Sequence, residues 1–262
     1  MKTAICADGF EVLKGDDLPK RCLQQDMMDR QRAFQVRLGK YDERLKDFGA
    51  ETFCLPYVVL HNLDMGIQEC GEAWDMVEGG WKHHKTKPTA ADPDELLMEL
   101  VDVAHFAINA YLFMGGQTEP VLVAASVGRS RQELRLPSIS FEDAWGFGER
   151  SWGRHGSKLE ALYGHGRGSH GQDWEKIAAT RINYLREKMC EVALTMRNGM
   201  KDMSASQRTP KNFPAASGYV FIEIFPWLYG AAQAIPGCTR EVFYSAFVHK
   251  NNINHARQDR GY

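Results

Sequence analysis

Apolar residues recur every three or four positions along much of this chain, which is the spacing of helices that bury one face. The first such stripe consists of Met27, Phe34, Leu38, Tyr41, Leu45 and Phe48. Two amides belong to the same helix, because Gln31 falls on the stripe and Gln35 lies at its edge. The pattern therefore predicts a helix from residue 27 onward whose buried face carries two polar side chains.

Four further helices are predicted over residues 61–77, 93–114, 174–196 and 241–258. The one at 93–114 begins with Pro93 in its first turn, followed by Asp94 and Glu95, and both features favour a helix start. No set of alternating strands accompanies these helices, so an α/β sheet is not expected. The sequence predicts an all-α helical bundle.

Composition adds mainly exclusions. The 262 residues carry 32 Lys and Arg against 34 Asp and Glu, so the net charge is -2 and no broad basic surface for nucleic acid is expected. The six cysteines form no C-x-x-C pair, which suits reduced thiols in a cytoplasm. Residues 1–14 lack a signal-peptide pattern, and Glu223 and Pro226 interrupt the most apolar stretch, so we expect a cytoplasmic protein without membrane contact.

Carboxylates with helical spacing give the first candidate chemistry. The helix at 61–77 carries Glu69, Glu72 and Asp75, and the helix at 93–114 carries Glu99 and Asp102. Spacings of three and four place each set along one helical face. The neighbours of Glu99 and Asp102 are mostly apolar, and buried carboxylates need cations or donors. Two such helices packed together would form an oxygen-lined cage for hard divalent metals, above all Mg²⁺.

Two other interpretations of these acids remain open. Such spacing is most often a solvated helix face, and the apolar company of Glu99 and Asp102 argues against that here. His105, three residues after Asp102, is typical of a di-iron helix bundle. The facing helix offers no second histidine at the required offset, so we expect His105 to be a hydrogen-bonded core residue.

The last predicted helix changes from apolar to basic along one face. That face consists of Phe243, Phe247, Lys250, Asn254 and Arg257. Beside a metal cage, these donors would suit the oxygens of a polyphosphate, and Lys82 and Lys85 would add charge. The alternative is a solvated basic tail.

Four segments together carry a family resemblance. They are E-C-G-E-A-W-D (69–75), W-K-H-H-K (81–85), E-L-V-D-V-A-H-F (99–106) and K-N-N-I-N-H-A-R-Q-D-R-G-Y (250–262). In this order they resemble the dimeric dUTPases of the all-α NTP pyrophosphatase superfamily. The ending R-Q-D-R-G-Y and the segment D-R-Q-R-A-F-Q-V-R-L (29–38) are most similar to T-even-type phage dCTP/dUTP pyrophosphatases. The matching pieces cover under half of the chain.

The resemblance implies a role for particular residues. Catalysis and the binding of two or more Mg²⁺ ions, for which Mn²⁺ is expected to substitute, would fall to Glu69, Glu72, Glu99 and Asp102. Phosphate binding would fall to Lys82, Lys250, Asn254, Arg257 and Tyr262, and base binding to Gln31, Gln35 and Trp81. His83 and His84 stand where the dUTPases usually carry further tryptophans, so the choice of base is left open.

The implied reaction is hydrolysis of dUTP, dCTP or both to the nucleoside monophosphate and pyrophosphate, with a water oriented by Glu69 or Glu72. The resemblance also implies a homodimer, in the host cytoplasm if the protein is encoded by a phage. Two alternatives are hydrolysis of a purine or modified-base triphosphate on the same fold, and a non-enzymatic helical oligomerisation or regulatory protein.

The motifs divide the chain into three parts. An N-terminal segment, 1–25, precedes a catalytic helical core at 26–116 and 241–262. By analogy with the dimeric dUTPases, 117–240 is an inserted helical and loop segment that forms a lid or a dimer contact. Within it, Gly166-x-Gly168-x-x-Gly171 matches a dinucleotide-binding string, but no strand precedes it, so a mobile loop is expected instead.

Overall fold

A computed structural model describes residues 10–20, 22–39, 56–77, 91–113, 145, 174–201 and 224–261 of the chain. All regular secondary structure within these ranges is helical, and they contain no strand. The predicted all-α fold is therefore confirmed. The glycine-rich tract at 146–171, and Tyr41, Leu45 and Phe48 of the first predicted stripe, lie outside the described residues.

The helices follow the predicted pattern with shifted ends. They are the 3-10 turn η1 (Gly15–Asp17), α1 (Leu23–Leu38), α2 (Pro56–Val77), α3 (Pro93–Phe113), α5 (Trp174–Lys201) and α7 (Arg240–Asp259). Residues 224–232 are helical as well. α2 begins five residues before the predicted start at residue 61, and α1 begins four residues before Met27. Both extensions add apolar residues to buried helix faces, including Leu23 and Val59.

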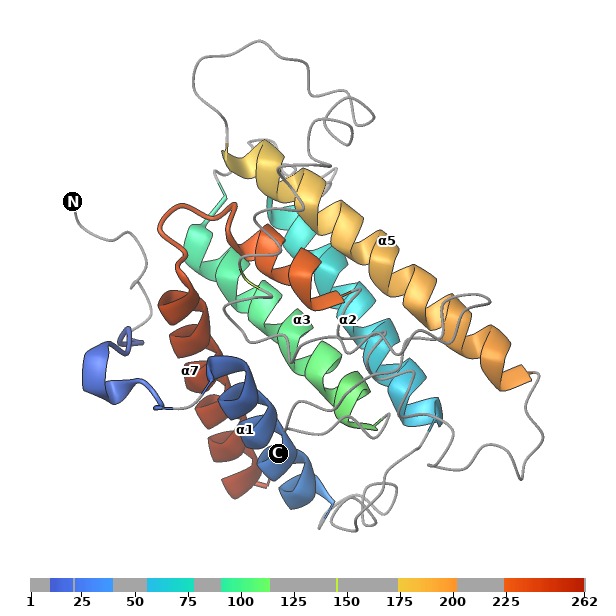
Figure 1. The fold of residues 1–262 in the computed structure, drawn as a ribbon, viewed down its shortest axis with the longest axis horizontal. Coiled ribbons are helices and arrows are strands. Elements are labelled where there is room, and N and C mark those ends of the chain that lie inside the picture. The colour runs from blue at the N-terminus through green and yellow to red at the C-terminus, as the bar shows by residue number, and fades with distance from the viewer. Residues whose placement is uncertain are drawn as a thin grey trace, which may run out of the picture.

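Three helices, α2, α3 and α5, lie side by side, with α2 in the middle of the three, while α1 and α7 cover the other side of α3 (Figure 1). α2 and α5 run antiparallel, because Asp64 near the start of α2 pairs with Arg197 near the end of α5, and Cys70 contacts Met189. α1 and α7 run parallel, since Asp26 bonds Tyr244 and Gln31 bonds Asn251. α3 is therefore enclosed on both sides.

The start of α3 is well capped and its body is buried. The Asp92 carboxylate accepts a 2.8 Å hydrogen bond from the Asp94 amide, and Pro93 occupies the first turn. By length and composition α3 would be able to cross a membrane, but 78% of its apolar window is buried inside the protein. Such burial is expected for the central helix of a bundle, and it places Glu99 and Asp102 within the fold.

Part of the 117–240 segment contributes to the hydrophobic core. From residues 224–232, Trp227 packs edge-on against Tyr184 of α5 at 4.5 Å, and Tyr229 packs edge-on against Phe243 of α7 at 5.5 Å. The Tyr229 hydroxyl also donates to Gln24 of α1. This helix and α5 therefore share one core with the other helices, while a lid or dimer role for this segment remains a prediction.

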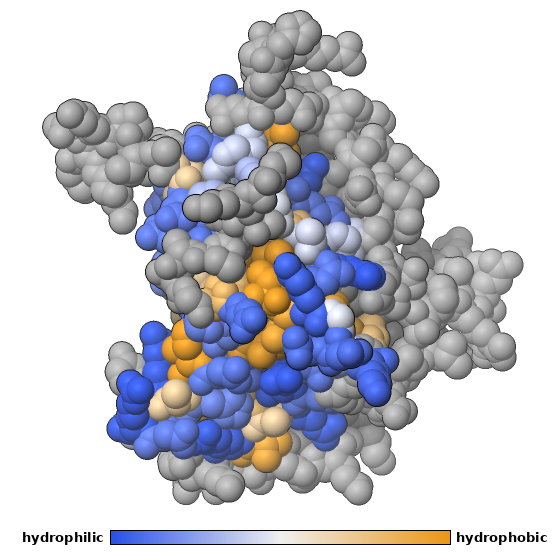
Figure 2. All heavy atoms as spheres, turned by 90° about the vertical axis from the view of Figure 1, so that its left-hand side faces the viewer, coloured by the Kyte–Doolittle hydropathy of each residue, from blue (hydrophilic) through white to orange (hydrophobic). Residues whose placement is uncertain are grey.

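The face formed largely by α1 and α7 is mostly hydrophilic, with an apolar band across its middle (Figure 2). Beneath this face, α1 buries four polar side chains, which are Gln24, Asp26, Gln31 and Gln35. A buried polar group must find a hydrogen-bond partner, so these residues fix α1 against particular atoms of its neighbours. Two of them, Gln31 and Gln35, turn toward α3, where the candidate site lies.

Candidate metal centre and adjoining pocket

Three carboxylates from two helices come together beside α7. Glu69 of α2 and Glu99 and Asp102 of α3 each place a carboxylate oxygen within 4.8 Å of the others, and all three side chains are partly buried. Glu99 and Asp102 are three residues apart and so share a face of α3, which packs closely on α2. The structure thus brings together three of the four residues predicted to bind metal.

The pKa values of all three carboxyl groups are raised by burial and by the negative charges of their neighbours. Burial raises the pKa of Glu69 to about 7, with further contributions from the negative charges of Asp102, Glu72 and Glu99. Burial and the charge of Asp102 also raise the pKa of Glu99. Burial raises that of Asp102 as well, although Lys250 opposes the shift. The raised pKa values mean that the charged forms of these carboxylates are disfavoured. A hard divalent cation prefers oxygen ligands and would offset the negative charges, so the cluster suits such an ion.

Glu72, the fourth predicted ligand, lies apart from this cluster. Its side chain is exposed and accepts a 3.2 Å hydrogen bond from Gln68, one turn earlier on α2. It is nonetheless near enough for its charge to raise the pKa of Glu69. Asp75 is also outside the cluster. A role for Glu72 as a metal ligand stays a prediction, and its position at the open side also suits a residue that contacts water.

Cations of α7 face the carboxylates. The Lys250 ammonium lies 2.5 Å from the Asp102 carboxylate, and the two side chains are 21% and 19% exposed. Arg257 is exposed, and its positive charge opposes the rise in the pKa of Asp102 that burial causes. Asn254, between these two along the helix, lines the pocket described next. The polar face of α7 therefore contacts the acidic cluster through Lys250 and lines the adjoining pocket through Asn254.

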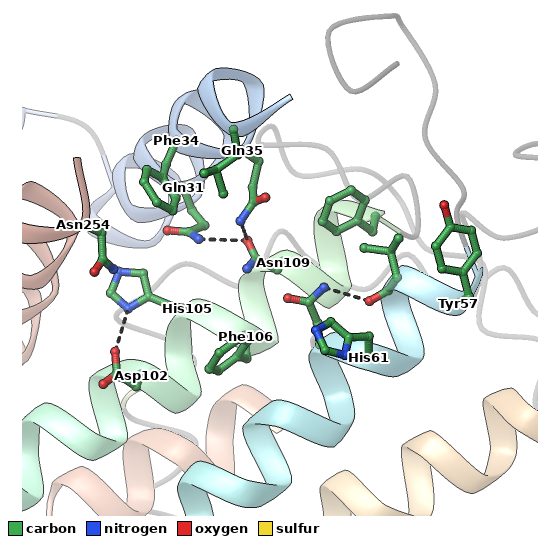
Figure 3. A pocket seen from close by; sticks show the side chains of 14 residues that line it. Gln31, Phe34, Gln35, Tyr57, His61, Asp102, His105, Phe106, Asn109 and Asn254 are labelled. Atoms are coloured by element: carbon green, nitrogen blue, oxygen red, sulfur yellow. Dashed lines mark hydrogen bonds and ion pairs between the residues drawn. The ribbon is translucent and has the colours of Figure 1, made fainter. Parts of the chain in front are cut away.

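A pocket of about 310 Å³ lies beside the cluster, between α1, α2, α3 and α7 (Figure 3). It is lined by Gln31, Phe34, Gln35, Leu38, Tyr57, Val58, His61, Asn62, Asp102, His105, Phe106, Asn109, Phe113 and Asn254. Asp102 belongs to both the pocket and the carboxylate cluster. A ligand could therefore reach from one into the other.

Amides from three helices meet at one wall of the pocket. The Asn109 side-chain oxygen accepts 2.9 Å hydrogen bonds from the amide nitrogens of both Gln31 and Gln35 (Figure 3). The Gln31 oxygen in turn accepts a 3.2 Å bond from Asn251 of α7. Both acceptor positions of the Asn109 oxygen are thus used, which leaves its Nδ2 as a donor toward a ligand. Gln31, Gln35, Asn109 and Asn251 form an amide network.

His105 lies between the cluster and the amide network. Its Nδ1 is 2.9 Å from the Val101 carbonyl oxygen, and its ring stacks on Phe247 of α7 with centroids 4.2 Å apart and planes 13° apart. Burial lowers the pKa of His105 to about 3. As predicted, it is a buried histidine, 5% exposed, but its Nε2 has no hydrogen-bond partner in the described part of the chain. It is therefore only half satisfied.

Not every predicted site residue can be placed. Trp81, Lys82 and Tyr262, together with Lys85, His83 and His84, lie outside the described residues. Conversely, Asn109 was not predicted, although it lies seven residues after Asp102 and hence on the same face of α3. That spacing, in an otherwise apolar stretch, was the signal that could have revealed it.

Comparison of the chain with protein-family models, curated proteins and solved structures gave no match. The dUTPase resemblance of the motifs therefore remains an expectation from the sequence.

Proposed function

We propose that this protein is a Mg²⁺-dependent nucleoside triphosphate pyrophosphohydrolase that converts a pyrimidine deoxynucleotide, dUTP, dCTP or both, to the monophosphate and pyrophosphate. The observation that carries the proposal is the shared position of Asp102, which belongs to the acidic cluster and to an amide-lined pocket. A metal-bound triphosphate and a base need these two environments side by side. The motif resemblance is consistent with the same reaction.

The dimensions of α3 support this proposal. Asp102 and Asn109 are seven residues apart, which corresponds to about 10 Å along the helix axis. This is the scale that separates the α-phosphate of a nucleotide from the far edge of its base. The triphosphate would lie at the carboxylates and the base at the amide network, with the sugar in between.

The carboxylates of Glu69, Glu99 and Asp102 fit a metal-binding role because they offer only oxygen donors and repel one another without a cation. When bound, Mg²⁺, or Mn²⁺ in its place, supplies charge neutralisation at the phosphate oxygens and lowers the pKa of water. Lys250 and Arg257 would donate to further phosphate oxygens from the α7 side. Asn254 would add an amide donor at the pocket edge.

Glu72 is our candidate for the residue that orients water and accepts its proton. It lies outside the carboxylate cluster, is exposed, and is three residues from Glu69 on the same face of α2. The water oxygen bonds to the α-phosphorus while the bond from that phosphorus to the bridging oxygen breaks, so pyrophosphate leaves. The displaced proton passes to the Glu72 carboxylate.

The amide network would recognise the base. Gln31 and Gln35 hold the Asn109 oxygen, so the Asn109 amide nitrogen is oriented as a donor toward the pocket. A carbonyl oxygen of uracil or cytosine, or the N3 nitrogen of cytosine, would accept from it. Phe34 and Phe106 provide apolar surface for the base in the same pocket.

The test is pyrophosphate release by the full chain from each canonical dNTP, with Mg²⁺ and with a chelator. We expect Mg²⁺-dependent release from dUTP or dCTP with formation of the monophosphate. An Asp64→Asn variant should release pyrophosphate at the wild-type rate. Asp64 is an exposed acid of α2 that pairs with Arg197 and does not line the pocket. Turnover of purine nucleotides alone, or of none, would reject the proposal.

A further inference from the structure

The His105 ring has a fixed orientation. Its Nδ1 lies 2.9 Å from the Val101 carbonyl oxygen, one turn earlier on α3, and its face stacks on Phe247 at 4.2 Å. Both contacts resist rotation of the ring. His105 is also 5% exposed, so solvent cannot replace either contact readily.

This geometry determines the hydrogen-bonding character of Nε2. A carbonyl oxygen only accepts hydrogen bonds, so Nδ1 must carry the proton that is donated to Val101. In the neutral ring the other nitrogen, Nε2, then presents a lone pair and accepts. Nε2 has no partner in the described part of the chain, although buried polar atoms nearly always have one.

The position of the ring indicates where its partner would come from. His105 lines the pocket, three residues after Asp102 and four before Asn109, or about 4.5 Å and about 6 Å along the helix axis. Figure 3 shows the ring with Nδ1 toward Asp102 and Nε2 on the side of Asn254. A ligand that spans the carboxylates and the amide network would pass this ring.

We propose that His105 is a specificity-determining residue whose Nε2 accepts a hydrogen bond from an N–H or O–H group of the bound nucleotide. This inference rests on the proposed function. Such a group can come from two parts of a pyrimidine deoxynucleotide, the sugar 3′-hydroxyl or an N–H of the base. A ligand without a donor at this point leaves the buried lone pair unpaired and binds less tightly.

The experiment combines one protein change with two ligand changes in the full-length protein. His105→Phe keeps an aromatic ring to stack on Phe247 and removes the acceptor. The ligands are the natural nucleotide, its 2′,3′-dideoxy analogue, and a base analogue without the donor, N3-methyl for uracil or 4-deamino for cytosine. We measure kcat and KM for each, and the inhibition constant of each analogue against the natural nucleotide.

For the natural nucleotide we expect His105→Phe to raise KM roughly tenfold with kcat nearly unchanged. An analogue that lacks the relevant donor should bind wild type and His105→Phe equally well. If this analogue is the dideoxy nucleotide, the donor is the sugar 3′-hydroxyl. If it is the base analogue, the donor is an N–H of the base. Equal penalties for all three ligands, or no penalty for the natural one, would overturn the inference and leave His105 a structural residue.

His249→Phe is the matched control. The same substitution is made on α7, where the His249 ring contacts Phe10 at 5.7 Å and does not line the pocket. It should leave all three KM values unchanged. A wild-type protein that hydrolyses no nucleotide would count against the proposed function itself. An active wild type with an unaffected His105→Phe variant would count against this inference alone.

Discussion

At the residue scale, the acidic cluster places three carboxylates close together at partly buried positions, where their negative charges are unfavourable. Glu69, Glu99 and Asp102 keep oxygens within 4.8 Å of one another, and one lysine, Lys250, offsets part of their charge. Clusters with raised carboxyl pKa values are common at functional sites because stability alone does not favour them.

The stability of the metal-free protein should depend on Glu69 in a defined pH window. Its pKa is raised to about 7 in the folded state from 4.5, so the folded state binds more protons between these values. Stability contributed by Glu69 therefore falls as pH rises from 4.5 through 7. We expect Glu69→Gln to raise Tm relative to wild type at pH 8, but not at pH 4, when both are measured with a chelator.

His105 changes the stability of the protein in the opposite direction. Its pKa of about 3 in the folded state lies below the ordinary 6.5, so its contribution to stability rises with pH over that interval. Both proteins contain His105, so the difference in Tm between wild type and Glu69→Gln isolates the effect of Glu69. Adding Mg²⁺ at pH 8 should raise Tm of the wild type more than that of the variant. A Tm difference between the two proteins that is independent of pH would contradict the raised pKa of Glu69.

Glu72→Gln tests the candidate for proton transfer. We expect kcat for the nucleotide to fall by roughly 10² to 10⁴, the range associated with loss of a general base. The helical circular dichroism should persist, because Glu72 is exposed and, within the described part of the chain, its side chain hydrogen-bonds only to Gln68. Full turnover by this variant would remove Glu72 from the mechanism.

At the element scale, α7 is the helix that joins the parts of the site. It supplies Lys250 to the carboxylates, Asn251 to the amide network and Phe247 to the stack on His105. Lys250 and Asn251 follow Phe247 by three and four residues, so all three lie within about one turn of α7. A small shift of α7 against α3 would therefore alter the contacts of Asp102, the amide network and His105 together.

Lys250 and a metal ion should compete for Asp102. In Lys250→Met the ammonium 2.5 Å from the Asp102 carboxylate is removed while the aliphatic stem remains. We expect titration calorimetry with Mg²⁺ alone to show tighter binding than in wild type, and KM for the nucleotide to rise because a phosphate donor is lost. Lys188→Met, on α5 beside Glu191, is the control. Weaker Mg²⁺ binding in Lys250→Met would contradict this account.

At the scale of the whole molecule, local periodicity predicted more of the fold than of the site. Start signals at Pro93 predicted the helix at 93–114, and i, i+4 and i+7 spacing marked one face of the helix at 241–258. The ends of α3 and α7 were thereby predicted within a residue. The same spacing placed Glu99 beside Asp102. The partners of Gln31, by contrast, come from α3 and α7, and no local pattern states which helices pack together.

Gly66 of α2 lies against the end of the Met189 side chain of α5 and against Phe106 of α3. A Cβ at this position would clash with Cε of Met189 and lie 3.4 Å from Cβ of Phe106, whereas a Cβ at Gly71 on the same helix would meet nothing within 4 Å. Gly66→Leu should therefore lower the free energy of unfolding by about 1–3 kcal/mol. Gly71→Leu is the control, and denaturant titration measures both. Equal stability of the two variants would contradict the packing described here.

The central claim is that the carboxylate cluster makes this bundle a nucleotide pyrophosphohydrolase. The most direct measurement is release of pyrophosphate and monophosphate from dUTP and dCTP by wild type, Glu99→Gln and Glu95→Gln. Both glutamates are on α3, but Glu99 is in the cluster while Glu95 is exposed one turn earlier. We expect equimolar, Mg²⁺-dependent products from wild type and Glu95→Gln, and a loss of roughly 100-fold or more in Glu99→Gln. Equal rates in both variants, or no pyrophosphate from the wild type, would contradict the claim.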